Sequence, residues 1–150
     1  MHFYRKVFEL LISRLKINKM EYSYIINDVH RTVLVTVIGE LYVNDFAQLN
    51  IKACSVAQKL NYKLIFNFTN AVVRIGLGEA YFWFSEHLGK SNTPSMRIPT
   101  AYIANDLNEA FFRFVEVAWT NRGSRTKMFK KVESALEWLD QFDKVNLSQY

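Results

Sequence analysis

The feature of this sequence that most restricts its fold is the alternation of short β-branched segments with longer segments of helical periodicity. The stretches VLVTVI (residues 33–38) and KLIFNFT (residues 63–69) have the composition of buried strands. Between them, apolar residues recur at helical spacing from Phe46 to Leu60. A single helix between two strands predicts parallel pairing through a right-handed crossover, because parallel strands need a long connection. The predicted fold class is therefore α/β.

The same patterns continue to the end of the chain. Strands are expected at residues 22–28, 33–38, 63–69, 98–104 and 125–130, and helices at residues 44–60, 79–88, 106–121 and 132–142. Gly39 is expected to end the second strand, and residues 70–78 are expected to form a loop. Asn44 is the expected N-cap of the first of these helices, and Asp106 with Glu109 has the form of a capping box. The expected architecture is a mixed five-stranded sheet, mostly parallel with an antiparallel edge hairpin, with about four helices and an N-terminal amphipathic helix.

Residues 1–19 are expected to form an amphipathic basic leader helix ahead of a domain at residues 20–150. Apolar side chains fall on one helical stripe at Tyr4, Phe8, Leu11 and Leu15. The first 20 residues hold five basic side chains and one acidic one, a net charge of +4 out of the +5 of the whole chain. Glu9 and Arg14 interrupt its apolar run, which is too short to span a membrane, and no signal-peptide cleavage site follows. The segment is expected to pack on the domain or a second copy, to make a peripheral contact with an anionic membrane, or to be a product of start-site choice ahead of Met20.

Composition limits the possible classes of protein. A chain of 150 residues that is 50% hydrophobic suits one domain with a core. Cys54 is the only cysteine, which excludes an intramolecular disulfide and favours a reducing compartment, so the expected location is cytoplasmic. Because most of the net charge lies in the leader, basic residues are not spread along one face of the domain. No nucleic-acid partner is therefore expected.

Motifs that carry chemistry are few. Gly76-Leu77-Gly78 lies between a strand and a helix, the setting of a phosphate cradle, but Tyr81 replaces the third glycine and Glu79 would repel an anion. Cys54 lies in an apolar helix and is expected to pack in the core rather than act as a nucleophile. No metal-binding spacing involves the three histidines, His2, His30 and His87. We expect no cofactor, no metal and no enzymatic activity.

Three stretches resemble parts of a known family. The stretch VLVTVIGELYVNDF resembles the family's opening strand, glycine and helix start. The stretch KLIFNFTNAVVRIGLGEA resembles its strand–loop–helix corner. The stretch MFKKVESALEWL resembles its closing strand and helix. In this order, residues 20–142 resemble the SpoIIAA-like branch of the STAS superfamily. Lys131 departs from that branch, which usually has a Ser or Thr helix cap there. The resemblance implies the family's fold and a tendency to bind protein partners or apolar ligands.

The resemblance also bears on regulation. Anti-sigma-factor antagonists of this superfamily are phosphorylated by a partner kinase on a serine that follows an Asp-x-Ser strand end. Placed on this sequence, that strand end falls on Asn67 and Thr69, and the phosphoacceptor falls on Gly76. Glycine has no hydroxyl, so phosphorylation at Gly76 is chemically impossible. Some related proteins resemble the CRAL-TRIO lipid carriers, which implies an apolar ligand as an alternative.

The candidate contact residues lie after the third strand and on the next two helices. Asn70 and Arg74 are near the carboxyl end of that strand, where α/β proteins bind ligands. The four aromatics of YFWF (residues 81–84) cannot face one core, because successive helical side chains are about 100° apart. Phe84, in register with Ala80 and Leu88, is expected to face the core. The candidates for partner or ligand contact are Asn70, Arg74, Tyr81, Phe82, Trp83, Phe112 and Trp119.

Two functions are compatible with these features. The first is a non-enzymatic, STAS-like binding or regulatory module that acts through protein–protein contacts, with a protein partner or as a homodimer. The alternative is a carrier or sensor of an apolar small ligand, such as a lipid or fatty acid. Its pocket would be lined by the helices at residues 79–88 and 106–121.

Overall fold

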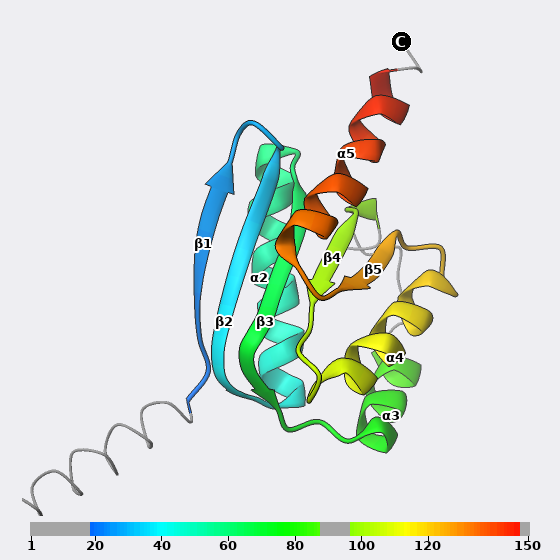
Figure 1. Cartoon of the computed structure of the whole chain (residues 1–150). Helices are drawn as coiled ribbons and strands as arrows, with labels where there is room; N and C mark the ends of the chain where they lie inside the picture. The colour runs from blue at the N-terminus through cyan, green and yellow to red at the C-terminus, as the bar shows by residue number, and fades with distance from the viewer. Residues whose placement is uncertain (1–18, 88–96, 148–150) are drawn as a thin grey trace, which may run out of the picture.

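The chain forms one mixed sheet with helices on both faces (Figure 1). The computed structural model describes residues 19–87 and 97–147. The elements are β1 (Glu21–Asn27), β2 (Thr32–Leu41), α2 (Val43–Leu60), β3 (Lys63–Val73), α3 (Leu77–His87), β4 (Thr100–Ile103), α4 (Glu109–Thr120), β5 (Thr126–Phe129) and α5 (Val132–Leu147). The strands lie in the order β1-β2-β3-β4-β5, with β1 antiparallel to β2 and the other pairs parallel. The predicted fold class is confirmed. The predicted leader helix lies outside the described residues, apart from Lys19, whose backbone bridges to Glu40.

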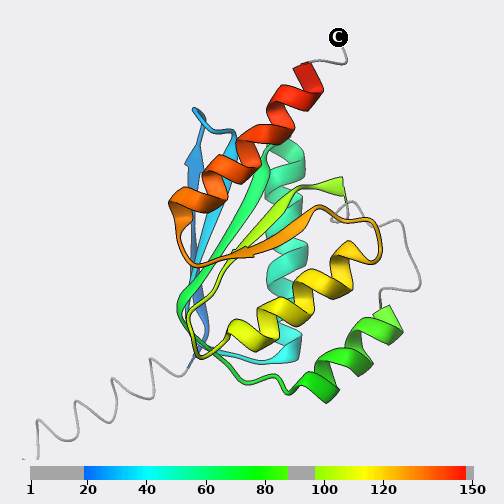
Figure 2. The same ribbon diagram turned by 45° about the vertical axis from the view of Figure 1, so that its right-hand side comes forward.

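Two hydrophobic layers sandwich the sheet. On one face, α2, α3 and α4 cover a core that includes Val33, Val35 and Val37, all fully buried. On the other face, α5 packs Ala135 and Leu139 against the second layer. Figure 2 shows α5 on the opposite side of the sheet from α2 and α4. The valines of the β-branched run of β2 are therefore buried in the core, as its composition predicts.

Aromatic rings fill the larger layer. Phe112 lies 4.6 Å from Phe68 and 5.4 Å from Tyr102 between ring centroids. Phe46 of α2 meets this cluster from the other side, 5.4 Å from Phe111. Such offset and edge-on ring contacts are favourable beyond simple burial. They connect β3, β4, α2 and α4 into one core.

The second and third strands are longer than the sequence pattern predicts. The expectation that Gly39 ends β2 is wrong: the strand continues to Leu41, and Gly39 adopts a φ of 89°. Only glycine adopts this conformation at low cost, so it absorbs local distortion without ending the strand. The β2–β3 register shifts between Thr36 and Ile38, and pairing then resumes. The extended β2 gives β3 a partner up to Val73, so most of the loop predicted at residues 70–78 is strand or helix instead.

The predicted N-cap at Asn44 is also wrong. Helix α2 begins at Val43, with Tyr42 as its N-cap residue. The Asp45 carboxylate accepts a hydrogen bond from the Tyr42 backbone N–H at 3.0 Å, which ties the first turn together. Acidic side chains are favourable in a first turn because of the exposed N–H groups there. The helix itself is where the sequence predicts it, and only the cap residue differs.

Candidate functional site

The exposed face of α3

Helix α3 follows β3 after a three-residue connection. The Arg74 backbone N–H donates to the Leu41 carbonyl at 2.8 Å, which fixes the chain beside the end of β2. The Ala80 N–H donates to the Gly76 carbonyl at 2.9 Å, so Gly76 opens the helix. The helix begins at Leu77, two residues earlier than predicted. This places α3 at the carboxyl edge of the parallel strands.

The inner face of α3 is the one that the helical spacing predicts. Ala80 and Phe84, four residues apart, are 1% and 4% exposed. The Phe84 ring lies edge-on to Phe114 at 5.7 Å and to Trp119 at 5.9 Å. These contacts join α3 to α4, and the prediction that Phe84 faces the core is confirmed.

Three large apolar side chains of α3 are in contact with solvent. Leu77, Tyr81 and Phe82 are 52%, 66% and 68% exposed. We refer to these three residues as the α3 face. Trp83 is half-buried, with its ring edge-on to Phe84 at 5.2 Å. Exposed aromatic residues gathered on one helix mark surfaces that bind partners more often than they mark ordinary surface.

Other predicted site residues

Asn70 and Arg74 lie near the α3 face but have different environments. Asn70 lies on β3, in register with Ile38, and is exposed. Arg74 forms an ion pair with Glu40 at 3.0 Å. The same carboxylate group also accepts a hydrogen bond from the Tyr42 hydroxyl at 3.3 Å. The Arg74 charge is therefore matched by a carboxylate at the end of β2.

Phe112 and Trp119 point inward. Phe112 is fully buried in the aromatic cluster. Trp119 is 8% exposed, and within the described part of the chain its indole Nε1 has no hydrogen-bond partner. A buried donor without an acceptor is unfavourable by roughly 1–3 kcal/mol. The seven predicted residues therefore occupy three places: the end of β3, the α3 helix, and the core beneath it.

A polar network at the carboxyl edge

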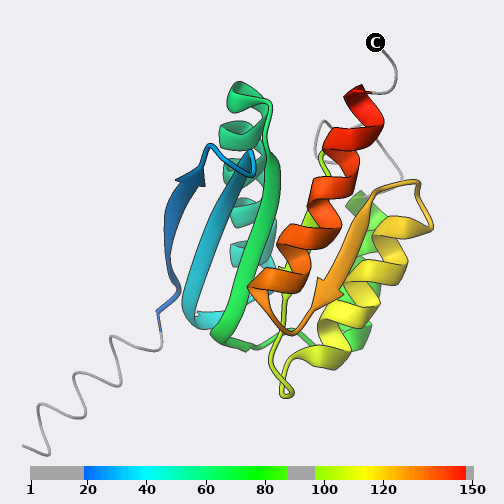
Figure 3. The ribbon, with the colours of Figure 1, turned by 45° about the horizontal axis from the view of Figure 1, so that its top comes forward.

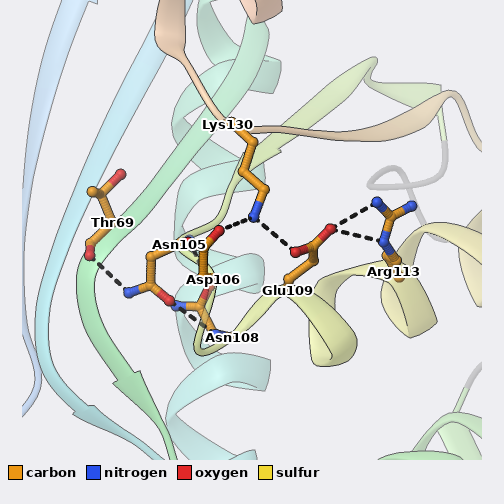
Figure 4. A network of polar contacts seen from close by, with 7 residues as sticks. All are labelled: Thr69, Asn105, Asp106, Asn108, Glu109, Arg113 and Lys130. Atoms are coloured by element: carbon orange, nitrogen blue, oxygen red, sulfur yellow. Dashed lines mark hydrogen bonds and ion pairs between the residues drawn. The ribbon is translucent and has the colours of Figure 1, made fainter.

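A polar network joins the end of β5 to the start of α4 (Figure 4). Lys130 Nζ lies 2.8 Å from the Asp106 carboxylate and 2.9 Å from that of Glu109. Glu109 also binds Arg113 at 2.7 Å, one helical turn later. The Glu109–Arg113 spacing was visible in the sequence, but the contribution of Lys130, 21 residues away, was not.

The charges in this network shift the pKa values of Glu109 and Lys130. Hydrogen bonds from Lys130 and Arg113 hold the pKa of the Glu109 carboxyl below its usual value of 4.5. Hydrogen bonds to Asp106 and Glu109 raise the pKa of the Lys130 ammonium above its usual value of 10.5. Two cations face two carboxylates, so the network is close to neutral. It offers no surplus positive charge to an anionic ligand.

The predicted capping box at Asp106 and Glu109 is wrong, and a similar arrangement occurs one residue earlier. The Asn105 N–H donates to the Asn108 side-chain oxygen at 2.8 Å, and the Asn108 N–H donates to that of Asn105 at 2.9 Å. This reciprocal pair precedes α4, which begins at Glu109. Asp106 and Glu109 are instead held by Lys130.

The two asparagine amides also complete the end of β3. Asn108 Nδ2 donates to the Phe68 carbonyl at 3.1 Å and to the Ala71 carbonyl at 3.4 Å. Asn105 Nδ2 donates to the Thr69 carbonyl at 2.9 Å. Pairing of β3 with β4 ends at Asn67, so these carbonyls have lost their strand partner. The amides replace it, and the buried carbonyls of Phe68 and Ala71 require such a partner.

Chemistry and comparisons

The described residues show little that points to covalent or metal chemistry. Burial raises the pKa of the Cys54 thiol to about 12, so it is protonated at neutral pH and is a poor nucleophile. Within the described ranges, no group of three or more metal-ligating side chains is close enough to hold an ion. No helix in the part of the chain that the structure describes is long and apolar enough to cross a membrane.

Comparisons with known proteins address the fold. No protein-family model matches the chain, and no curated protein matches it. Among solved structures, the chain is similar to an uncharacterized protein of the DUF3478 family with a SpoIIAA-like fold from Shewanella loihica PV-4. That similarity has a probability of 1.00, a TM-score of 0.49 and 18% identity, and covers 80% of this chain and 93% of the other. The SpoIIAA-like fold of that protein is the fold that the sequence motifs resemble.

Proposed function

We propose that this protein is a non-enzymatic, STAS-like binding module that acts through protein–protein contacts, with the α3 face as its docking surface. The observation that supports this function is the exposure of Leu77, Tyr81 and Phe82 on a helix that is held in place by buried residues. The buried side, with Ala80 and Phe84, anchors the helix. The exposed side chains are therefore presented on a supported element rather than on a loose loop.

The size of these side chains is sufficient for a docking surface. A Tyr or Phe ring buries about 150–250 Å² when covered completely. Tyr81 and Phe82 are about two thirds exposed, so covering each would contribute roughly 3 kcal/mol at about 25 cal/mol per Å². Aromatic residues are also enriched among the residues that dominate binding energy.

Charge and chemistry around the α3 face restrict the partner. Glu79 and Glu86 on the same helix are exposed. A partner with an apolar groove bordered by Lys or Arg would complement this surface. Gly76, at the start of the helix, has no hydroxyl, so binding here would not be controlled by phosphorylation at that position.

Site-specific photo-crosslinking in the source cells tests the proposal. A photoreactive phenylalanine analogue would replace Phe82, and in the control it would replace Ile51, which is 71% exposed on α2. We expect a discrete adduct with one protein from position 82 and none from position 51. The purified partner should then bind the full chain, and Tyr81→Ser with Phe82→Ser should weaken that binding at least tenfold. Equal crosslinking from both positions would contradict the proposal.

One observation favours the carrier alternative. Trp119 Nε1, which has no hydrogen-bond partner among the described residues, lies among apolar side chains near α3. The carboxyl or carbonyl oxygen of an apolar ligand would accept its hydrogen bond there. Native mass spectrometry of the purified protein would then show a bound lipid-sized adduct, and Trp119→Phe, which keeps the ring and removes the donor, would lose it. A spectrum of unliganded protein would exclude this function.

A further inference from the structure

Strand β1 is an open edge of the sheet. It pairs along its seven residues with β2, and its other side has no strand partner among the described residues. Figure 1 shows β1 as the outermost strand. Every second residue of such a strand presents an unpaired N–H and C=O to solvent, which is a template for another strand. Seven residues extend for roughly 23 Å, long enough for a substantial ladder.

The composition of β1 does not protect this edge. From Tyr22 to Asn27 the strand has no charged residue and no proline. Ile25 and Ile26, which point to opposite faces, are 57% and 49% exposed. Natural proteins usually block an open edge with lysine, proline, a bulge or a very short strand.

The opposite edge of the sheet has the protection that β1 lacks. Strand β5 is four residues long, and Lys127 within it is exposed. Arg125 precedes the strand, and Lys130 and Lys131 follow it, all three exposed. The two edges of the sheet therefore differ in their protection against pairing with another strand. This contrast indicates that β1 is the edge at which a strand is accepted.

We propose that β1 pairs antiparallel with β1 of a second copy, across a two-fold axis at Tyr24, to give a ten-stranded sheet. An antiparallel pair related by a two-fold axis perpendicular to the sheet keeps each face on its own side. Two residues that pair across this axis must point to the same face of the sheet. Because side chains alternate between the two faces along a strand, the numbers of the paired residues are both odd or both even. The register centred on Tyr24 is the one that pairs all seven residues.

The side chains complement one another in this register. Tyr22 and Tyr24 lie on the α2 side of the sheet, so Tyr24 meets its own copy and Tyr22 meets Ile26. Ile25 pairs with Leu34, which packs beneath α5, so Ile25 lies on the other side and meets Ser23. Aromatic and β-branched cross-strand pairs are among the favourable ones. Figure 3 shows α5 nearer to β4 and β5 than to β1, so this helix does not cover the outer edge of β1.

The charged residues at the two ends of β1 are compatible with this register. Glu21 would face Asn27 of the second copy. The Asn27 side-chain oxygen accepts hydrogen bonds from the Val29 and His30 N–H groups, so its amide nitrogen can donate to Glu21. Asp28 would face Met20 of the second copy, between Lys19 and Glu21, which are both exposed. By symmetry each contact occurs twice. No like charges face each other along the ladder.

The first test is the mass of the full chain in solution, by size exclusion with light scattering up to ~100 µM, where a Kd in the micromolar range gives a dimer. We expect twice the chain mass of 17.7 kDa. Ser23→Lys with Ile25→Lys places like charges opposite each other on exposed positions and should give a monomer. Ile51→Lys, on an exposed position of α2, should remain a dimer. A monomeric wild-type chain, or a dimer that the double variant leaves intact, would overturn the proposal.

A charge-swap experiment tests the register and guards against misfolded variants. Ser23→Glu with Ile25→Glu should also be monomeric, and mixing it with the lysine variant should restore a 1:1 heterodimer. In addition, Tyr24→Cys should form an interchain disulfide, because facing Cα atoms lie about 4.5–5.5 Å apart and a disulfide spans about 4.4–6.8 Å. Cys54 is buried and would not compete. Failure of the mixture to associate would overturn the register. The α3 face is not part of this interface, so this outcome is independent of the proposed function.

Discussion

Replacement of Asn108 by alanine tests the polar junction that holds the end of β3 against the start of α4. Asn108 is 4% exposed, and its side chain makes hydrogen bonds to the Phe68 and Ala71 carbonyls and from the Asn105 N–H. Each such bond has a net value of about 0.5–1.5 kcal/mol, and the longest, at 3.4 Å, contributes least. We expect Asn108→Ala to lower the free energy of unfolding by about 2–4 kcal/mol.

The companion variant Asn108→Asp separates the donor from the acceptor. Its carboxylate keeps an acceptor for the Asn105 N–H. Its second oxygen, however, would face the Phe68 and Ala71 carbonyl oxygens, which need a donor. We expect it to be at least as destabilised as Asn108→Ala at neutral pH. Acidification that protonates the carboxyl restores a donor, so this variant alone should recover stability relative to wild type.

Urea unfolding followed by tryptophan fluorescence measures these differences, because the chain has three tryptophans. Leu107→Ala is the control: the neighbouring side chain is 94% exposed, and its loss should change stability by less than about 0.5 kcal/mol. If Asn108→Ala also falls within about 0.5 kcal/mol of wild type, the two amides do not hold this junction as described.

Three further predictions concern the core and the network. Phe112→Ala should lower the free energy of unfolding by about 3–5 kcal/mol in urea titrations, because the ring is fully buried; a loss below about 1 kcal/mol would refute the packing. Cys54, with a pKa of about 12 and a buried thiol, should react with a thiol reagent at neutral pH only as fast as the protein opens; immediate labelling would contradict its burial. Glu109 has a lowered pKa, so its contribution is present above pH 4.5 and lost as the pH falls through the folded-state value. Wild type should therefore exceed Glu109→Gln in stability at neutral pH and converge with it in acid, and a pH-independent difference would be inconsistent with the ion pairs.

The structural features that the sequence predicted correctly are those that depend on local sequence pattern. The run VLVTVI forms the centre of β2, and the helical spacing of Ala80 and Phe84 identified the buried side of α3. The strands joined by single helices are parallel, as crossover connections require. These features follow from residues close to one another along the chain.

What the sequence did not predict depends on distant partners. Gly39 continues β2 because β3 is there to pair with the residues beyond it, up to Leu41 opposite Val73. Asp106 and Glu109 have the spacing of a capping box, but Lys130 from beyond β5 takes both carboxylates. Local spacing carries no information about either contact.

The candidate contact residues also show which features follow from local pattern and which depend on distant contacts. Pattern alone placed aromatic residues on two neighbouring helices, but it could not say that Phe112 fills the core while Phe82 is 68% exposed. That difference depends on how α3 packs against α2 and α4. The residues that bear on the proposed function are thus those that the packing leaves outside.

The central claim is that a partner covers the α3 face, and hydroxyl-radical footprinting tests it directly. Tyr81 and Tyr42 are 66% and 52% exposed, so both should be oxidised readily in the purified protein. In extract of the source cells, we expect protection of Tyr81 and Phe82 and unchanged oxidation of Tyr42. Equal oxidation of Tyr81 in purified protein and in extract would contradict the claim.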